Sequence, residues 1–120
     1  MSVLLLSADL MISSQLTGPA QQQGIPLQTV STTDAVVERC SEESVALVVL
    51  DLGMPGLDFA ALIESLRSCA KQPGAIVAFG PHVHENKLAA AREAGCDEVF
   101  SRGQFFSAAG EIFARYAKGN

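Results

Sequence analysis

The sequence predicts an α/β fold in which five parallel strands form one sheet with helices on both faces. Three short, strongly apolar runs have the length and composition of buried strands: residues 2–6 (SVLLL), 45–50 (VALVVL) and 75–79 (AIVAF). Segments with helical periodicity alternate with these runs, and that order produces a parallel sheet with right-handed crossovers. The hydrophobic fraction of 48% also suits a sheet that is covered on both faces. We therefore predict a doubly wound (βα)5 arrangement.

Two weaker strands complete the predicted sheet. Residues 25–30 (IPLQTV) carry Pro26 near their start, and this favours an edge strand because proline has no N–H for a neighbouring strand. Residues 97–101 (DEVFS) are short, with only Val99 and Phe100 apolar.

The first two helices are predicted at residues 9–23 and 33–42. The dipeptide Gly18-Pro19 falls inside the first, and we expect a break there because proline lacks an N–H and clashes with the preceding turn. Thr32 or Thr33 suits the N-cap of the second helix.

Three further helices follow the buried strands. Residues 58–69 place apolar side chains at i, i+3, i+4 and i+7, with Asp58 as the expected N-cap. Residues 84–94 are rich in alanine and end before Gly95, a residue typical of helix C-termini. Residues 104–117 carry one apolar stripe and are expected to form a single closing helix.

Composition and charge restrict the class of protein. We expect a single domain over residues 1–120, since this is an ordinary length for one hydrophobic core. A net charge of −5 without a Lys/Arg cluster argues against a nucleic-acid surface. The sequence lacks a basic leader and a run of about 20 apolar residues, so we expect a cytoplasmic protein without membrane contact. Cys40, Cys69 and Cys96 are odd in number and widely spaced, which favours reduced thiols.

Several polar residues follow the predicted strands and are expected at one edge of the sheet. Asp51 ends the third strand, Ser7 and Asp9 follow the first, Gly80 follows the fourth, and Arg102 follows the fifth. In a doubly wound sheet, the functional crevice lies at the carboxyl ends of the strands. A carboxylate at the end of an apolar strand must be paired, bound to a metal or solvated, so Asp51 is the centre of the candidate site.

The stretch LVVLDLGMPGLD (47–58) resembles the phosphoacceptor strand and following loop of the receiver domains of two-component response regulators. A second stretch, AGCDEVFSRGQF (94–105), is similar to the end of that family's fourth helix and its fifth strand. The resemblance spans the chain in length and element order, and implies a flavodoxin-like receiver topology. It also implies that Asp51 matches the nucleophile that takes a phosphoryl group from phosphohistidine, and that Gly53 matches the carbonyl ligand of Mg²⁺.

The acids that hold Mg²⁺ beside the nucleophile in that family are not matched. Their positions align with Ser7 and Ala8, and Asp9 lies one residue beyond them. A shift of one residue would bring Asp9 into the pair, but the spacing to Asp51 favours the first alignment. We therefore expect no metal site, with Asp9, Asp51 and Gly53 as weak candidate ligands.

Other positions of the family pattern also differ. Gly80 stands where the family has a hydroxyl residue that bonds the phosphate, and Val99 stands where it has a switching aromatic. Arg102 replaces the family's lysine, and Gly103 replaces the proline that follows it. Because a guanidinium matches a carboxylate with two parallel hydrogen bonds, we predict that Arg102 pairs with Asp51.

These departures favour a degenerate receiver-like module, a pseudo-receiver that signals through protein–protein interaction without Mg²⁺-dependent phosphorylation, enzymatic activity or cofactor. The alternative is an active receiver phosphorylated at Asp51 by a sensor histidine kinase, which would use Mg²⁺. A weaker alternative is a flavodoxin-like domain that binds a small ligand in the same crevice. The segment after the first strand lacks a Gly/Ser/Thr-rich phosphate loop, which argues against it.

The resemblance also implies the partners, which are a histidine kinase or an output domain or protein. The family's fourth helix, fifth strand and fifth helix commonly form its dimer or partner surface, and a homodimer here would use residues 88–94 and the helix from Phe105 to Tyr116. The aromatic stripe of that last helix is expected to pack mainly in the core. His82 and His84 lack further ligands nearby in sequence, so we expect loop or helix-capping roles for them.

Overall fold

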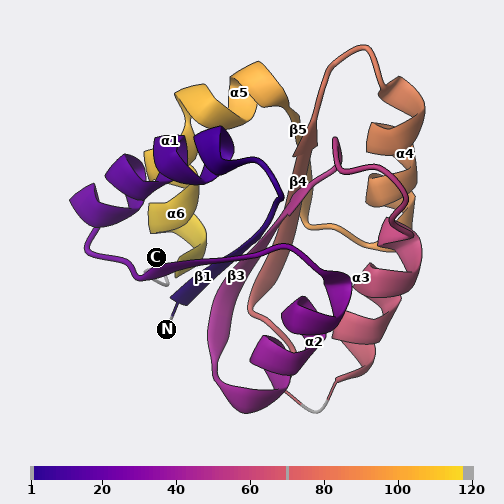
Figure 1. The fold of residues 1–120 in the computed structure, drawn as a ribbon, viewed down its shortest axis with the longest axis horizontal. Helices are drawn as coiled ribbons and strands as arrows, with labels where there is room; N and C mark the ends of the chain where they lie inside the picture. Colours follow the sequence, from indigo (N-terminus) through magenta and orange to yellow (C-terminus); the bar gives the residue numbers. More distant parts are fainter. Residues whose placement is uncertain (1, 70, 118–120) are drawn as a thin grey trace.

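The structure, a computed structural model, describes residues 2–69 and 71–117 and confirms the predicted α/β fold (Figure 1). Five parallel strands form one sheet in the order β2-β1-β3-β4-β5. The elements in chain order are β1 (Ser2–Leu6), α1 (Leu10–Gln22), β2 (Leu27–Val30), α2 (Thr33–Glu42), β3 (Val45–Asp51), α3 (Phe59–Ser68), β4 (Ala75–Gly80), α4 (Glu85–Ala94), β5 (Glu98–Ser101), α5 (Arg102–Ser107) and α6 (Ala109–Ala117). No helix in the described part of the chain combines the length and the apolar character needed to cross a membrane.

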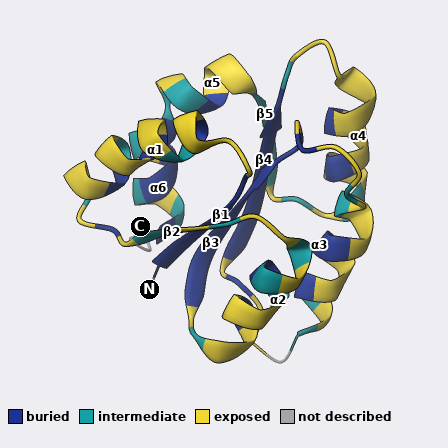
Figure 2. Cartoon of the chain, in the orientation of Figure 1, coloured by how far each residue is buried: buried dark blue, intermediate teal, exposed yellow. Residues whose placement is uncertain are grey.

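Helices cover both faces of the sheet, so the core has two layers. Helices α1, α5 and α6 cover one face, while α2, α3 and α4 cover the other (Figure 1). Successive strand residues point to opposite faces, so Val3 and Leu5 pack under the first group of helices, whereas Leu4 and Leu6 pack under the second. The three central strands are buried along their whole length, whereas the helices expose their outer sides (Figure 2).

Two edge strands close the sheet. Strand β2 begins directly after Pro26 and pairs only with β1, which confirms the edge position that this proline predicted. Strand β5 pairs only with β4 and is partly exposed along its length.

The N-caps that the sequence predicted are present. Thr32 accepts a hydrogen bond from the backbone N–H of Ala35, and Asp58 accepts one from that of Ala61. Gly95 ends α4 with a φ of 115°, a left-handed conformation that glycine adopts without a Cβ clash.

The predicted break at Gly18-Pro19 is wrong, because α1 continues through Pro19 to Gln22. Proline removes one helical hydrogen bond here, close to the C-terminal end of the helix. Leu16 and Ala20, which precede and follow the dipeptide, are buried in the core. Most helical stability in proteins comes from such packing, and it holds the last turn in place.

The prediction of one closing helix over 104–117 is also wrong. Ser101 and Gln104 form a capping box that begins α5 at Arg102, and the backbone leaves the helical conformation at Ala108 before α6 begins. The turn lets the two helices take different neighbours: α5 packs against β4 and β5, whereas α6 lies against α1, β1 and β3. The sequence period alone carries no information about this change of direction.

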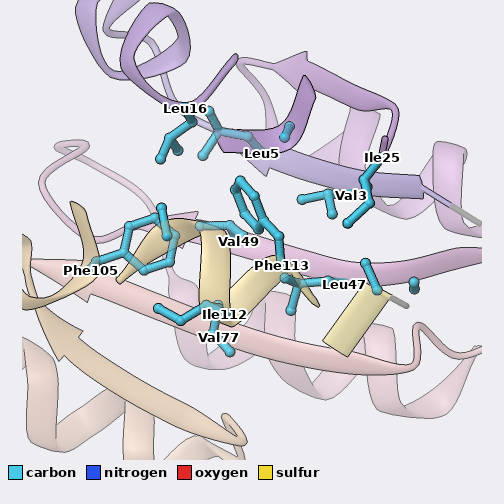
Figure 3. Packing of buried hydrophobic residues seen from close by; sticks show 14 of the residues in the cluster. Val3, Leu5, Leu16, Ile25, Leu47, Val49, Val77, Phe105, Ile112 and Phe113 are labelled. Atoms are coloured by element: carbon cyan, nitrogen blue, oxygen red, sulfur yellow. The ribbon is translucent and has the colours of Figure 1, made fainter. Parts of the chain in front are cut away.

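The aromatic stripe of these helices lies in the core, as predicted. Phe105 stacks on Phe79 of β4 with ring centroids 4.8 Å apart, and Phe113 meets the edge of Phe105. Figure 3 shows Phe105 and Phe113 among the apolar side chains of the sheet. Tyr116, near the end of the stripe, is only half-buried and donates its hydroxyl hydrogen to Glu98 of β5, which also pairs with Arg115 at 2.5 Å.

Replacing Phe105 with alanine should lower the free energy of unfolding by about 3–5 kcal/mol, since it leaves a cavity where a fully buried ring stacked on Phe79. The adjacent, half-buried Phe106 provides a matched control, and Phe106→Ala should cost less than half as much. Urea denaturation of both variants measures the difference. Equal losses would show that Phe105 does not anchor α5 to the sheet.

Stability should fall at high pH because of Tyr116. Burial, followed by the hydrogen bond to Glu98, raises the pKa of the Tyr116 hydroxyl from 10.0 to about 12. The folded state thus holds this proton more tightly than the unfolded chain, so the stabilisation is present below pH 10 and is lost as the pH rises towards 12. The loss of Tm between these pH values should be smaller in Tyr116→Phe than in the natural chain; identical Tm profiles would contradict the assignment.

Candidate functional site

Asp51 lies at the carboxyl end of the central strand β3, between β1 and β4. In the sheet register, Leu50 lies beside Leu6 of β1, and Asp51 lies beside Phe79 of β4. The segments after β1 and β4 therefore flank this aspartate on both sides, which is the arrangement that the topology predicted. The Asp51 residue is only 6% exposed, so its carboxylate depends on protein partners.

Two hydrogen bonds satisfy the Asp51 carboxylate. The hydroxyl of Ser7 donates to Oδ2 at 2.9 Å, and the backbone N–H of Gly53 donates to Oδ1 at 2.9 Å. Ser7 is itself 3% exposed, and its oxygen accepts a hydrogen bond from the backbone N–H of Asp9 at 3.1 Å. Each carboxylate oxygen thus has a donor, and the charge is held by a buried network of uncharged groups.

The prediction that Arg102 pairs with Asp51 is wrong. Nη2 of Arg102 instead lies 3.9 Å from Oδ2 of Asp9, and the guanidinium carbon lies 5.9 Å from the centre of the Phe106 ring. The capping box at Ser101 makes Arg102 the first residue of α5 and half-exposed, whereas Asp51 already accepts hydrogen bonds from Ser7 and Gly53. Arg102 still lines the same hollow as Asp51, but its ion pair is with Asp9.

Asp9 serves as the N-cap of α1. Its Oδ1 accepts a hydrogen bond from the backbone N–H of Met11 at 2.9 Å, and its side chain is half-exposed. Ser7, rather than Asp9, bonds the Asp51 side chain, and this agrees with the alignment that placed Ser7 and Ala8 at the acid positions. Ala8 is exposed and offers no oxygen beyond its backbone carbonyl.

The residues around Asp51 supply few of the ligands that Mg²⁺ takes in proteins. Mg²⁺ requires octahedral oxygen ligands and usually takes one or two carboxylates with water and phosphate oxygens. Both oxygens of Asp51 accept protein hydrogen bonds, while the Asp9 side chain caps a helix and meets Arg102. Within residues 2–69 and 71–117, no cluster of three or more His, Cys, Asp or Glu side chains has the arrangement of a metal site.

On the β4 side of Asp51, apolar side chains pack against Gly80. A Cβ added to Gly80 would lie 3.1 Å from Cβ of Leu52 and 3.5 Å from a methyl carbon of Leu88. A hydroxyl side chain at this position would therefore require Leu52 to move. Val99, at the position of the family's switching aromatic, packs partly buried against the core layer beneath α2, α3 and α4. Gly103 has open space around it, and the peptide bonds described are all trans.

Exposed apolar side chains lie at this edge of the sheet beside the charged ones. A hollow of about 580 Å³ lies beside Asp51, and the exposed Leu10 and Met11 form part of its rim. Leu10 is 85% exposed, Met11 is 69% exposed, and Val83 after β4 is 71% exposed. These residues were not predicted from the sequence, although Leu10 and Met11 fall outside the buried stripe of α1 and so carried a detectable signal.

The histidines and cysteines lie outside the lining of the hollow beside Asp51. His82 and His84 are exposed on the segment after β4, and His84 occupies the N-cap position of α4 without a side-chain capping bond. Cys40, Cys69 and Cys96 are free thiols. Burial raises the pKa of the Cys40 and Cys96 thiols to about 11, which makes them poor nucleophiles at neutral pH.

Comparison with solved structures identifies the fold. The receiver domain of a sensor histidine kinase from Pseudomonas aeruginosa PAO1, solved with magnesium in its active-site cleft, superposes with a TM-score of 0.81 at 14% identity, covering 98% of this chain and 97% of that chain. A response regulator receiver domain from Bermanella marisrubri gives 0.80 at 23% identity, covering 98% and 99%. The beryllofluoride-activated NtrC4 receiver domain dimer gives 0.76 at 19% identity, covering 96% and 98%. No protein-family model and no curated protein matches the sequence.

These likenesses establish the receiver-domain fold over nearly the whole chain. The family resemblance that the sequence suggested therefore agrees with the three-dimensional structure at the level of the fold.

Replacing Ser7 with alanine should lower the free energy of unfolding by about 1–3 kcal/mol, since Oδ2 of the buried Asp51 loses its donor. In an Asp51→Ala background, the same change should cost clearly less, and this double-mutant cycle isolates the pair. Arg102→Gln is the matched control and should stay within about 0.5 kcal/mol, because its ion pair is exposed. A larger cost for Arg102→Gln than for Ser7→Ala would contradict the assignment of Ser7 as the main support of the buried carboxylate.

Proposed function

We propose that this chain is a receiver-like signalling module that acts through contacts with other proteins and is not switched by Mg²⁺-dependent phosphorylation of Asp51. One observation carries the proposal. Asp51 keeps the position of the phosphoacceptor, but Ser7 and Gly53 bond both oxygens of its carboxylate, and the acids that would hold a metal beside it are replaced.

The chemistry of phosphoryl transfer supports the proposal that Asp51 is not phosphorylated. A carboxylate that attacks a phosphoryl group must overcome the repulsion between two anions, so catalysis rests on positioning and on cations that neutralise charge. Here the nearest cation, Arg102, pairs with Asp9 at the rim of the hollow. The hydroxyl that would bond the phosphate is missing at Gly80, and Leu52 occupies the adjacent space.

The exposed apolar residues at this edge support protein docking. Leu10, Met11 and Val83 are exposed in the segments after β1 and β4, the strands that flank Asp51. Of these, Leu10 and Met11 line the hollow beside Asp51, and exposed apolar groups at a hollow are typical of interaction sites. We infer that the partner is a histidine kinase or an output protein, because the neighbouring structures are receiver domains. Free cysteines agree with our expectation of a cytoplasmic protein.

A homodimer through α4 and the C-terminal helices stays a prediction. Ala89 and Ala90 of α4 are exposed and available for contact, and the NtrC4 receiver domain is itself a dimer. Phe105 and Phe113 are fully buried, so only Tyr116 of that aromatic stripe lies near the surface.

The second candidate function is an active phosphoacceptor receiver. The position of Asp51 at the end of β3 favours it, as does the fold shared with a receiver domain that was solved with magnesium in its cleft. The two functions differ in one measurable property, the response of Asp51 to phosphoryl donors.

Incubation with acetyl phosphate, or with beryllofluoride, in the presence of Mg²⁺ should leave the intact mass and the NMR signals around Asp51 unchanged. The reason is that the acids that would hold Mg²⁺ are replaced, and that Arg102, the cation in the lining of this hollow, pairs with Asp9. The NtrC4 receiver domain, which was solved in a beryllofluoride-activated form, is the positive control when treated identically. A saturable, Mg²⁺-dependent response that disappears in Asp51→Asn would overturn the proposal and establish the active receiver.

A further inference from the structure

A groove lies between the loop after β3 and helix α4, and it is distinct from the hollow beside Asp51. Its volume is about 540 Å³, within the range of small-molecule sites. Leu52 and Met54, 1% and 9% exposed, contribute to its lining together with Leu57 and Phe59. A largely apolar groove of this size suits a small organic molecule better than an ion.

Helix α4 contributes a cation to one wall of this groove. Lys87, Ala90 and Ala91 line the groove and are spaced i, i+3 and i+4, so they share one face of the helix. The two alanines have small side chains and leave this side of the groove open. Lys87 is the one basic residue in the lining.

The Lys87 ammonium is free to bind an anion. The residues three and four positions away on either side are Val83, His84, Ala90 and Ala91, none of which is acidic. Among residues 2–69 and 71–117, the ion pairs that form involve arginines and not Lys87. Lysine carries three donors, which a carboxylate can accept.

The one acidic residue of the lining is already engaged. Oδ1 of Asp58 accepts a hydrogen bond from the backbone N–H of Ala61 at 3.0 Å, and the positive end of the α3 dipole stabilises its charge. Asp58 and Lys87 thus bring one charge of each sign to the groove, and of the two side chains only that of Asp58 has a hydrogen-bond partner among the described residues.

We propose that this groove binds a small amphiphilic carboxylate. The apolar body of the ligand packs on Leu52, Met54 and Phe59, and its carboxylate accepts hydrogen bonds from Lys87. This site is distinct from the crevice at the strand ends, and it does not rest on the proposed signalling function.

Two methionines allow the site to be tested directly. Met54 lines the groove and also the hollow beside Asp51, whereas Met11 lines only the latter. In the chain labelled with methyl-¹³C methionine, decanoate should shift the Met54 methyl signal saturably and leave the Met11 signal unchanged. Decanol should bind about threefold to fivefold more weakly than decanoate, and decylammonium more weakly still, since both lose the ion pair with Lys87.

Variants separate the two parts of the proposal. In Lys87→Gln, decanoate and decanol should bind with similar affinity. Ala90→Glu places a carboxylate in the groove and should abolish the decanoate shift, whereas Ala89→Glu, its exposed neighbour outside the groove, should leave it intact. Both substitutions introduce a good helix former and the same charge, so they are matched.

Three outcomes would overturn the proposal. If the Met54 signal does not shift saturably, the groove is not a binding site. If Met11 shifts together with Met54, the ligand occupies the hollow beside Asp51 instead. If decylammonium binds as tightly as decanoate, the assignment of a carboxylate ligand is wrong. None of these outcomes bears on the response to acetyl phosphate, so the two proposals fail independently.

Discussion

The hydrogen bond from Ser7 to Asp51 is the interaction on which the rest of the site depends. A buried carboxylate at the end of an apolar strand is costly unless donors reach its oxygens, and the Ser7 hydroxyl and the Gly53 amide meet that need without any net charge. With Asp51 satisfied in this way, Arg102 pairs with Asp9 at the rim, and Asp9 caps α1. The polar groups at this edge therefore stabilise one another.

Satisfying the polar groups internally leaves the surroundings of the crevice largely apolar. Leu10 and Met11 lie exposed beside the hollow, and Leu52 fills the space next to Gly80. Met54 contributes to two hollows, one at the strand ends and one against α4. The edge at the carboxyl ends of the strands thus carries exposed apolar side chains beside the ion pair of Asp9 and Arg102.

Local signals in the sequence predicted most elements, and their failures share a cause. Thr32, Asp58 and Gly95 mark helix ends because capping depends on residues within one turn. Pro19 does not break α1, because Leu16 and Ala20 are held by distant core residues. The closing helix divides at Ala108 because its two parts pack on different strands, and a helical period does not reveal direction.

Hydrophobic periodicity and turn chemistry are local properties, and they were enough to predict the alternating fold, the edge position of β2 and the placement of Asp51 at the carboxyl end of a buried strand. The partner of the Asp51 side chain depends on contacts between distant segments. Ser7 and Asp51 are 44 residues apart, and the parallel register that sets Leu6 beside Leu50 brings them together. Arg102 suited a carboxylate chemically, but the start of α5 placed it beside Asp9. The residue type determines which hydrogen bonds a side chain can form. Strand register and helix direction determine which partners lie within its reach.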